Sequence, residues 1–375
     1  MSSIMNIEGG SALPNGTTNN NNESSSSTSL QLNHNMMKSL VVKYWILLMS
    51  AVLSVIGFIG GPLLLRLYFV YGGKRKWIPA LLGTAGFPVL LIPISINYLF
   101  HRRNSSGSSR KFFISRNLVL TAAVIGLLNG INNFMYAIGL SFLPVSTSAI
   151  VYSTYLIFIA FFALLIIRQS FTPYSVNSVV LMTLGSILLG IRQNGDRPPG
   201  VTGGQYLLGF LMTIGAAVLL GLINPCTELA FIKAAKSITY SSVLQFQFCN
   251  GLSASLFCIV GMIINKDFAA MPREATEFGL GESKYYLVLV MAAVACQMAF
   301  LGSVGMMFCS SALASGIFVA MLLPFATVGG AIAYHEKFSG EKGISLAMCL
   351  WGFASYFYGS YRDTKKQNTV SQIST

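Results

Sequence analysis

The sequence predicts an all-α integral membrane protein with ten transmembrane helices, arranged as two inverted repeats of five helices. Hydrophobic residues make up 54% of the 375 residues and charged residues only 9%, whereas soluble domains carry about 25% charged residues. Apolar runs of the length that a spanning helix needs, about 20 residues, recur between residues 41 and 361. A weak internal repeat also relates the two halves of the chain.

The first 40 residues differ in composition from all that follows. The stretch NGTTNNNNESSSSTS contains no apolar region, which is typical of neither a signal peptide nor a packed core. We therefore expect residues 1–40 to form a disordered polar tail. A second, shorter tail is expected at 362–375.

Ten apolar runs follow in order, and each is continuous rather than alternating. Continuous runs favour helices over a transmembrane β-barrel. The predicted spans are 44–69, 77–99, 117–139, 145–167, 174–192, 206–231, 241–264, 285–305, 311–334 and 343–361. The first repeat of five helices then occupies 41–192, a connecting loop 193–205, and the second repeat 206–361.

The basic residues set the expected orientation. The formal net charge is +13, and clusters such as KRK (74–76) and HRR (101–103) stand at the ends of apolar runs. There they face anionic lipid headgroups, so we expect no nucleic acid partner. The loop between the second and third spans carries five Lys and Arg residues. Because cytoplasmic loops are enriched in such residues, we predict cytosolic termini, with the plasma membrane as the expected location.

The internal repeat connects the last two spans of each half. With an offset of 167 residues, a unit of span, polar corner and span aligns with a second such unit. The matched pairs are Ser148 with Ser315, Ile150 with Ile317, Phe171 with Phe338, and Gly185 with Gly352. Five spans per half make the second half inverted relative to the first. Many secondary transporters have this design, with a site at the repeat interface near the midplane.

Several kinds of chemistry find no support in the sequence. The three histidines lie far apart, and the corner HEKFS that begins at His335 has Ser339 where a zincin motif needs its second histidine. We expect no metal, no cofactor and, since no catalytic pair is visible, no enzyme. No nucleotide-binding motif is found, which disfavours primary active transport. The six cysteines form no CxxC pair and are interpreted as soft core residues.

Polar side chains at membrane depth indicate a binding site for a small molecule. In the third and fourth spans they recur at the i, i+3/i+4, i+7 spacing of one helical face. An amide offers two donors and an acceptor and a tyrosine a flat face with a hydroxyl, which together suit a planar nitrogen heterocycle. Interhelical hydrogen bonding is the competing interpretation for each residue alone. The candidates are Asn129, Asn132, Asn133, Tyr136, Ser148, Tyr152, Tyr155, Asn224 and Gln297.

Glu228 is the one carboxylate that we place well inside a predicted span. An acid at the centre of a spanning helix costs about 2.5–3.5 kcal/mol on insertion scales, and an ionisable group there is by default a functional hypothesis. We predict that Glu228 carries the proton in a coupled transport step. The alternative is a helix-end ion pair with Lys233 or Lys236.

Longer stretches resemble the plant purine permease family. They are GGPLLLRLYFVYGGKRKW (60–77), TAGFPVLLIP (84–93), YAIGLSFLPVSTSAI (136–150) and FTPYSVNSVVLMTLGSILL (171–189). The resemblance covers all ten spans in order. It implies a member of the drug/metabolite transporter superfamily that takes up purines, cytokinins or related nitrogen heterocycles together with protons. Some relatives in the family carry plant alkaloids.

A few positions depart from the family's pattern. Tyr155 and Ile159 stand where relatives often have Gln and Asn, and Asn132 stands where they often have an acid, whereas Glu228 and Gln297 match. A site that loses a hydrogen-bonding partner discriminates strongly against ligands that need it. The departures therefore leave open a permease selective for alkaloids such as benzylisoquinolines. An uncoupled facilitator or exchanger, and a membrane receptor or scaffold, are further alternatives.

Overall fold

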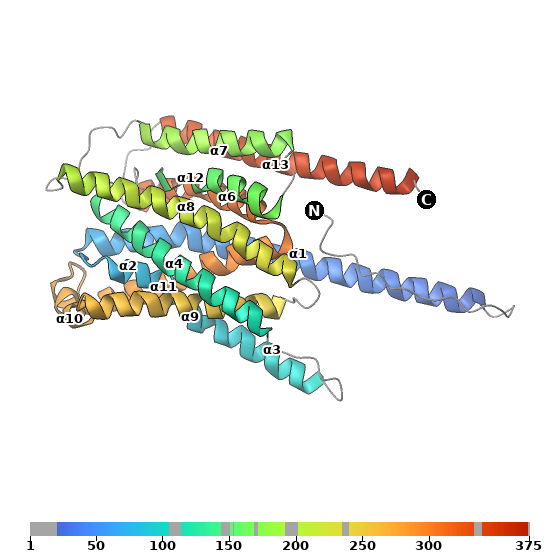
Figure 1. Ribbon diagram of the computed structural model, residues 1–375, viewed down its shortest axis with the longest axis horizontal. Helices are drawn as coiled ribbons and strands as arrows, with labels where there is room; N and C mark the ends of the chain where they lie inside the picture. The colour runs from blue at the N-terminus through green and yellow to red at the C-terminus, as the bar shows by residue number, and fades with distance from the viewer. Residues whose placement is uncertain are drawn as a thin grey trace.

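The computed structural model describes residues 21–104, 114–143, 151–152, 154–168, 172–191, 202–234, 240–333 and 340–373. Every regular element in these ranges is helical, and no strand occurs in them. Most of the helices run along one long axis of the molecule (Figure 1). The all-α class predicted from the sequence is confirmed.

Most of the helices are long and apolar, and two short segments are irregular: η1 is a 3-10 helix and η2 a π-helix. The bounds are α1 (Asn21–Val70), α2 (Trp77–Leu82), η1 (Phe87–Leu90), α3 (Leu91–Asn104), α4 (Arg116–Phe142), α6 (Tyr155–Phe162), η2 (Ala163–Ile167), α7 (Pro173–Ile191), α8 (Gly203–Lys233), α9 (Tyr240–Ile264), α10 (Asp267–Glu277), α11 (Glu282–Cys309), α12 (Ala312–Ala333) and α13 (Gly340–Ile373). Helix α10 is polar and lies between the predicted seventh and eighth spans, where no apolar run predicted a helix.

Six helical segments are long and apolar enough to cross a membrane. They are Val41–Phe69, Trp77–Leu99, Arg116–Phe142, Gly203–Lys233, Ser241–Ile264 and Glu282–Cys309. The other four predicted spans overlap α6 with η2, α7, α12 and α13. A membrane protein built of helices is thus confirmed, whereas the number of ten crossings and the two inverted repeats stay predictions. Helix α1 begins at Asn21, inside the segment expected to be a polar tail.

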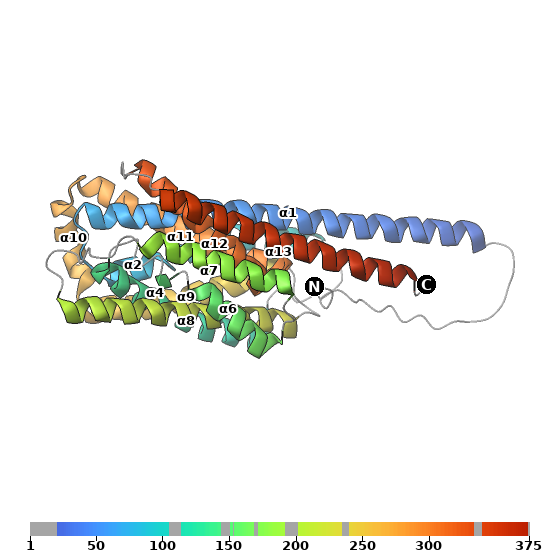
Figure 2. The same ribbon diagram turned by 90° about the horizontal axis from the view of Figure 1, so that it is seen from above.

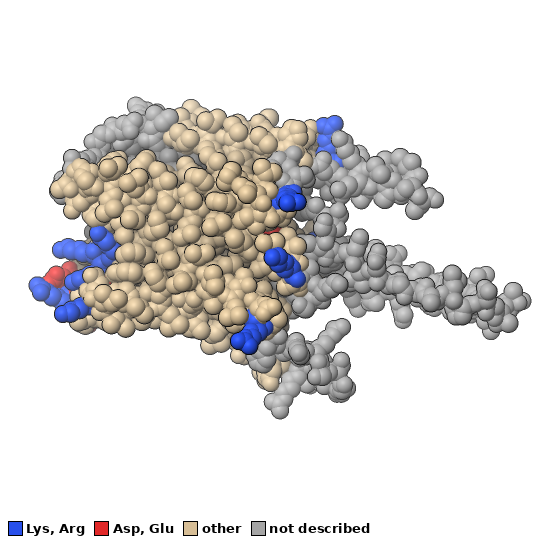
Figure 3. All heavy atoms as spheres, in the orientation of Figure 1, with Lys and Arg blue, Asp and Glu red and all other residues tan. Residues whose placement is uncertain are grey.

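The distribution of charge fits a membrane belt. On the face shown in Figure 3, Lys and Arg gather at the two ends of the bundle and not along its middle. The sides instead expose large apolar residues such as Leu256, Val260 and Ile263. Helices α1 and α13 project from one end, and α10 lies at the other (Figures 1 and 2). We call these the terminal end and the α10 end.

Close backbone contacts hold α1 against α11. A Cβ added to Gly57 would overlap the backbone of Ala299, and one added to Gly302 would overlap Ser50 and Ser54. Small residues that let helices approach this closely are the usual means of association in membranes, where lipid removes most of the hydrophobic driving force.

Gly57→Ala is therefore expected to lower the free energy of unfolding by about 1–3 kcal/mol, the usual cost of an overpacked contact. Gly60→Ala is the matched control, because an added Cβ on Gly60 meets no atom within 4 Å. Melting of both purified variants in detergent measures the difference. Equal melting temperatures would mean that the α1–α11 contact can open without cost.

The predicted second span is a broken helix. Helix α2 ends at Leu82, a turn covers 83–86, and η1 leads into α3. Gly83, Gly86 and Pro88 explain the break, because glycine weakens a helix and the proline lacks a backbone donor. Backbone that departs from a regular helix at membrane depth is tolerated only where protein or a cavity surrounds it. This turn, 83–86, is called the span-two break.

Candidate functional site

Buried amides from α4 form the centre of the candidate site. Asn129 and Asn132 are only 3% and 1% exposed. The Nδ2 of Asn129 donates to Oδ1 of Asn250 on α9 at 3.0 Å, and the Nδ2 of Asn132 donates to the hydroxyl of Tyr152 at 3.4 Å. The Oδ1 atoms of both α4 residues, and Nδ2 of Asn133, are buried without a partner in the described structure.

The span-two break lies against the same group of helices. A Cβ added to Gly83 would lie 2.6 Å from Nδ2 of Asn133, and one added to Gly86 would lie 2.5 Å from Cβ of Gln297 on α11. Within the break, the Thr84 hydroxyl accepts from Ser255 of α9 at 3.1 Å. The break is therefore surrounded by α4, α9 and α11.

Unsatisfied amides are concentrated around this break. Gln297 is 3% exposed, and its Nε2 joins the orphan atoms of Asn132 and Asn133. Leaving a buried polar group without a hydrogen bond costs about 1–3 kcal/mol. Natural proteins leave few such groups, and each calls for an explanation. The Nδ2 of Asn133 and the Nε2 of Gln297 are unused donors, and the Oδ1 of Asn132 is an unused acceptor. Together they offer hydrogen-bonding partners for the edge of a polar ligand.

The tyrosines form a ladder beside the amides. The rings of Tyr136 and Tyr152 lie 4.3 Å apart between centroids, and those of Tyr152 and Tyr155 lie 5.9 Å apart. The Tyr155 hydroxyl donates to the carbonyl of Gly316 on α12 at 3.2 Å. The ladder thus leads from the α4 amides to α12.

The other sequence-predicted positions are less central. Tyr155 and Ile159 are buried in an apolar cluster with Met182 and Ile317, so Ile159 packs against the core in this conformation. Asn224 is half-buried on α8. Ser148, which the sequence predicts to bind the substrate, lies outside the described residues.

Glu228 links α8 to the start of α12. Its side chain is 8% exposed, and its Oε2 accepts from the backbone N–H of Ala312 at 2.7 Å. Free N–H groups and the helix dipole at a helix N-terminus favour a carboxylate. The described residues place no ion pair on Glu228, and Lys236 lies outside them. The alternative pairing with Lys233 has no support in the structure.

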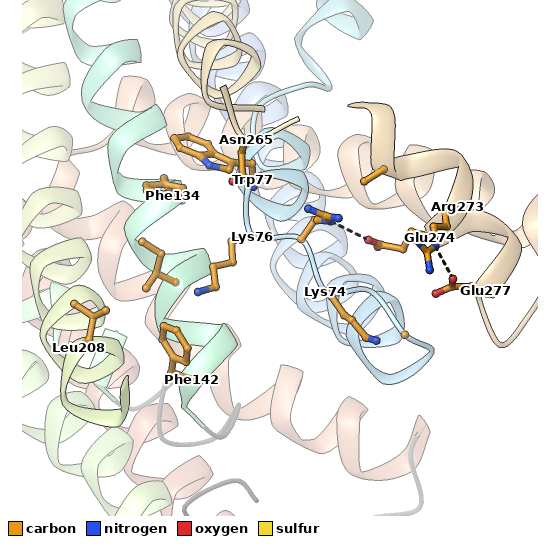
Figure 4. Close-up of a pocket in the computed structure, with 14 residues that line it drawn as sticks. Lys74, Lys76, Trp77, Phe134, Phe142, Leu208, Asn265, Arg273, Glu274 and Glu277 are labelled. Atoms are coloured by element: carbon orange, nitrogen blue, oxygen red, sulfur yellow. Dashed lines mark hydrogen bonds and ion pairs between the residues drawn. The ribbon is translucent and has the colours of Figure 1, made fainter. Parts of the chain in front are cut away.

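Sequence reasoning missed a cavity at the α10 end. It has a volume of ≈ 640 Å³ and includes Lys76 and Trp77 from the start of the second span, Phe134 and Phe142 from α4, and Glu274 from α10 (Figure 4). The only signal was the run KRKW at 74–77, which was interpreted as a headgroup anchor.

Comparison with known proteins agrees with a transporter. A family model described as purine nucleobase transmembrane transport matches residues 45–366. Purine permease 3 of Arabidopsis thaliana is 44% identical over 339 residues, covering 90% of this chain and 95% of the relative. Purine permease 2 of the same plant is 39% identical over 349 residues, covering 88% and 98%.

A crystal structure of a protein with 18% identity aligns over 83% of this chain and 98% of that one with a TM-score of 0.55, which shows a shared fold alone. The named relatives are permeases, which are transporters and not enzymes. The resemblance stated from the sequence is confirmed, and this chain belongs to the family of purine nucleobase transmembrane transporters.

Proposed function

We propose that this chain is a proton-coupled secondary transporter that imports planar nitrogen heterocycles, namely purines, cytokinins or purine-like compounds, across the plasma membrane. The observation that carries the proposal is the layer of buried amide atoms without a partner: Nδ2 of Asn133 and Nε2 of Gln297 beside the span-two break, and Oδ1 of the neighbouring Asn132. A purine edge carries alternating donors and acceptors, which such amides match. The nearby tyrosine rings offer faces on which a planar ring stacks.

Transport follows from alternating access between two repeats of five helices, with ten crossings in all. Support comes from the contact between α7 and α13. An added Cβ on Gly185 would meet Ser345 and Cys349, and one on Gly352 would meet Ser178 and Met182.

Three of the pairs in this contact that are related by the offset of 167 residues are Gly185 with Gly352, Ser178 with Ser345, and Met182 with Cys349. Gly185 meets Ser345 and Cys349, and Gly352 meets Ser178 and Met182, which are their equivalents in the other half. Reciprocal contacts of this kind are those of a two-fold axis. Along the contact, the residue numbers of α13 fall as those of α7 rise, so the two helices are antiparallel, as an inverted repeat requires.

The proton is assigned to Glu228. Coupling requires that the proton and the substrate favour the same conformational state. A charged carboxylate holds the N-terminus of α12, and a neutral one holds it less strongly because the dipole interaction is lost. Protonation would thus loosen α12 from α8, and the two helices belong to the same proposed second repeat.

We place the termini in the cytosol as part of this proposal. Helices α1 and α13 project from the same end of the bundle (Figure 2), as an even number of crossings requires. The α10 end then faces outward, and the loop with five Lys and Arg residues faces the cytosol.

The proposal is tested by uptake in yeast that lacks its own purine carriers. We expect adenine uptake that acid stimulates and a protonophore inhibits, and little uptake of a benzylisoquinoline alkaloid. Alkaloid uptake without adenine uptake would replace the substrate class by the alkaloid alternative. Adenine uptake with counterflow but no response to the protonophore would establish the uncoupled facilitator instead.

A further inference from the structure

The cavity at the α10 end is separate from the amide layer. Three residues of α4 at successive turns, Phe134, Ile138 and Phe142, line it. Asn132 and Asn133, which each have one buried amide atom without a partner, precede Phe134 on the same helix. The cavity thus lies between the proposed outer face and the amide layer, on the α10 side of Phe134. Its ≈ 640 Å³ is within the range of ordinary ligand pockets.

An aromatic layer divides the two regions. The Trp77 indole stacks on the Phe134 ring with centroids 3.6 Å apart and planes 16° apart, and it lies 5.9 Å from the ring of Phe257. A Cβ on Gly261 would overlap the indole, so glycine is needed there for the indole to take this place. Trp77 is also the first residue of α2, the short helix that ends at the span-two break.

The acidic groups of the cavity are neutralised by arginines. Arg75 approaches Glu274 of the lining within 3.9 Å, and it also pairs at 3.2 Å with the buried Asp267, which does not line the cavity. The Tyr68 hydroxyl also donates to Glu274 at 2.6 Å. On the outer side of α10, Arg273 pairs with Glu277 at 3.0 Å. No carboxylate of the described lining is therefore free to attract a cation.

The lysines of the cavity are not paired in this way. Among the described residues no acid lies within ion-pair distance of Lys74 or Lys76. Lys76 reaches toward α4, with its Nζ 3.9 Å from the centroid of the Phe142 ring (Figure 4). Burial lowers the pKa of the Lys76 ammonium by desolvating its charge. An acceptor atom on a ligand would replace the lost hydration.

We propose that this cavity is an outer binding site for a planar nitrogen heterocycle in its neutral or anionic form, with Lys76 as the donor to a ring nitrogen or carbonyl oxygen and with Trp77 as the aromatic wall that the ligand touches on the inner side. The inference rests on the proposed function, since the substrate would bind in this cavity before it reaches the amide layer. A surplus of positive charge at the entrance favours such ligands and repels protonated amines. Trp77 must leave Phe134 before a ligand can pass inward.

Tryptophan fluorescence tests the proposal directly, because the chain has three tryptophans. Trp45 and Trp351 are 61% and 69% exposed, and neither lines the cavity. In the double variant Trp45→Phe/Trp351→Phe, the emission comes from Trp77 alone. Adenine is expected to quench this emission saturably in the full-length protein in nanodiscs, and N-methylquinolinium, a permanent planar cation, to quench it more weakly.

Three further substitutions in that background locate the ligand. Lys76→Glu is expected to weaken adenine binding about tenfold, the loss of one charge-assisted hydrogen bond, and to strengthen binding of the cation. Lys284→Glu, an exposed charge at the same end but outside the cavity lining, should change neither. Asn132→Ala should leave the quenching intact while uptake is lost. Phe142→Leu serves in place of Lys76→Glu if the latter does not fold, and should weaken adenine quenching in the same direction.

The proposal is overturned if adenine fails to quench Trp77, if Asn132→Ala removes the quenching, or if the cation binds the unsubstituted cavity more tightly than adenine. Saturable quenching that depends on Lys76 in a chain that shows no uptake would leave the outer site standing and refute the proposed function. Uptake without quenching would do the reverse. The two proposals can therefore fail separately.

Discussion

Glu228→Gln is expected to abolish the dependence of uptake on the proton gradient. The glutamine keeps an oxygen that accepts from Ala312, so the contact between α8 and α12 survives, but the side chain no longer takes up or releases a proton. Uptake in acid should fall to the level seen at neutral pH with a protonophore, a loss of about 5–150-fold, the range of typical coupling energies. The measurement is initial uptake of labelled adenine at both pH values.

The control for this variant is Glu282→Gln. Glu282 is exposed in the first turn of α11 at the α10 end, and its loss should leave the response to pH unchanged. Counterflow should persist in Glu228→Gln, because exchange of substrate needs no net proton movement. If Glu228→Gln retains acid stimulation equal to that of the unsubstituted protein, Glu228 is only a structural link to α12, and the proton moves elsewhere.

The class of the fold was predictable because it depends on composition and on runs of apolar residues. Each of the ten predicted spans overlaps a helix, with bounds that differ by several residues at polar ends. The interior of the second span was not predictable in the same way. Its residues Trp77 to Leu99 have a mean hydropathy high enough for a continuous span, and hydropathy does not report where Gly83 and Gly86 interrupt a helix.

The site was predicted only in part, because an i, i+4, i+7 pattern identifies a face but not its partner. Asn129 and Asn132 are buried as expected, yet Asn129 donates to Asn250 on another helix. Ile159, which stands where relatives often have Asn, packs in an apolar cluster. The cavity at the α10 end combines residues from four segments that are far apart in the sequence, and no local pattern brings Trp77 to Phe134.

Gln297→Met is expected to remove function without removing stability. The side chain is 3% exposed with an unpartnered Nε2, so a methionine of similar size relieves an unsatisfied donor. The free energy of unfolding should stay level or rise by about 1 kcal/mol, since an orphaned polar group costs this much or more. Uptake of adenine at low concentration should fall by about 10–100-fold, the value of one buried hydrogen bond to a ligand.

Gln245→Met is the matched control, because Gln245 is a glutamine of similar burial on α9. Its Oε1 accepts from the backbone N–H of Ile114 at 3.1 Å, just before α4 begins. Removing that acceptor orphans the N–H and should destabilise the protein by about 1–3 kcal/mol, while the folded fraction keeps its KM for adenine. Melting in detergent together with KM separates the two glutamines. If both variants melt earlier and neither changes KM, Gln297 is part of the packing, and the amide layer around the span-two break does not bind the substrate.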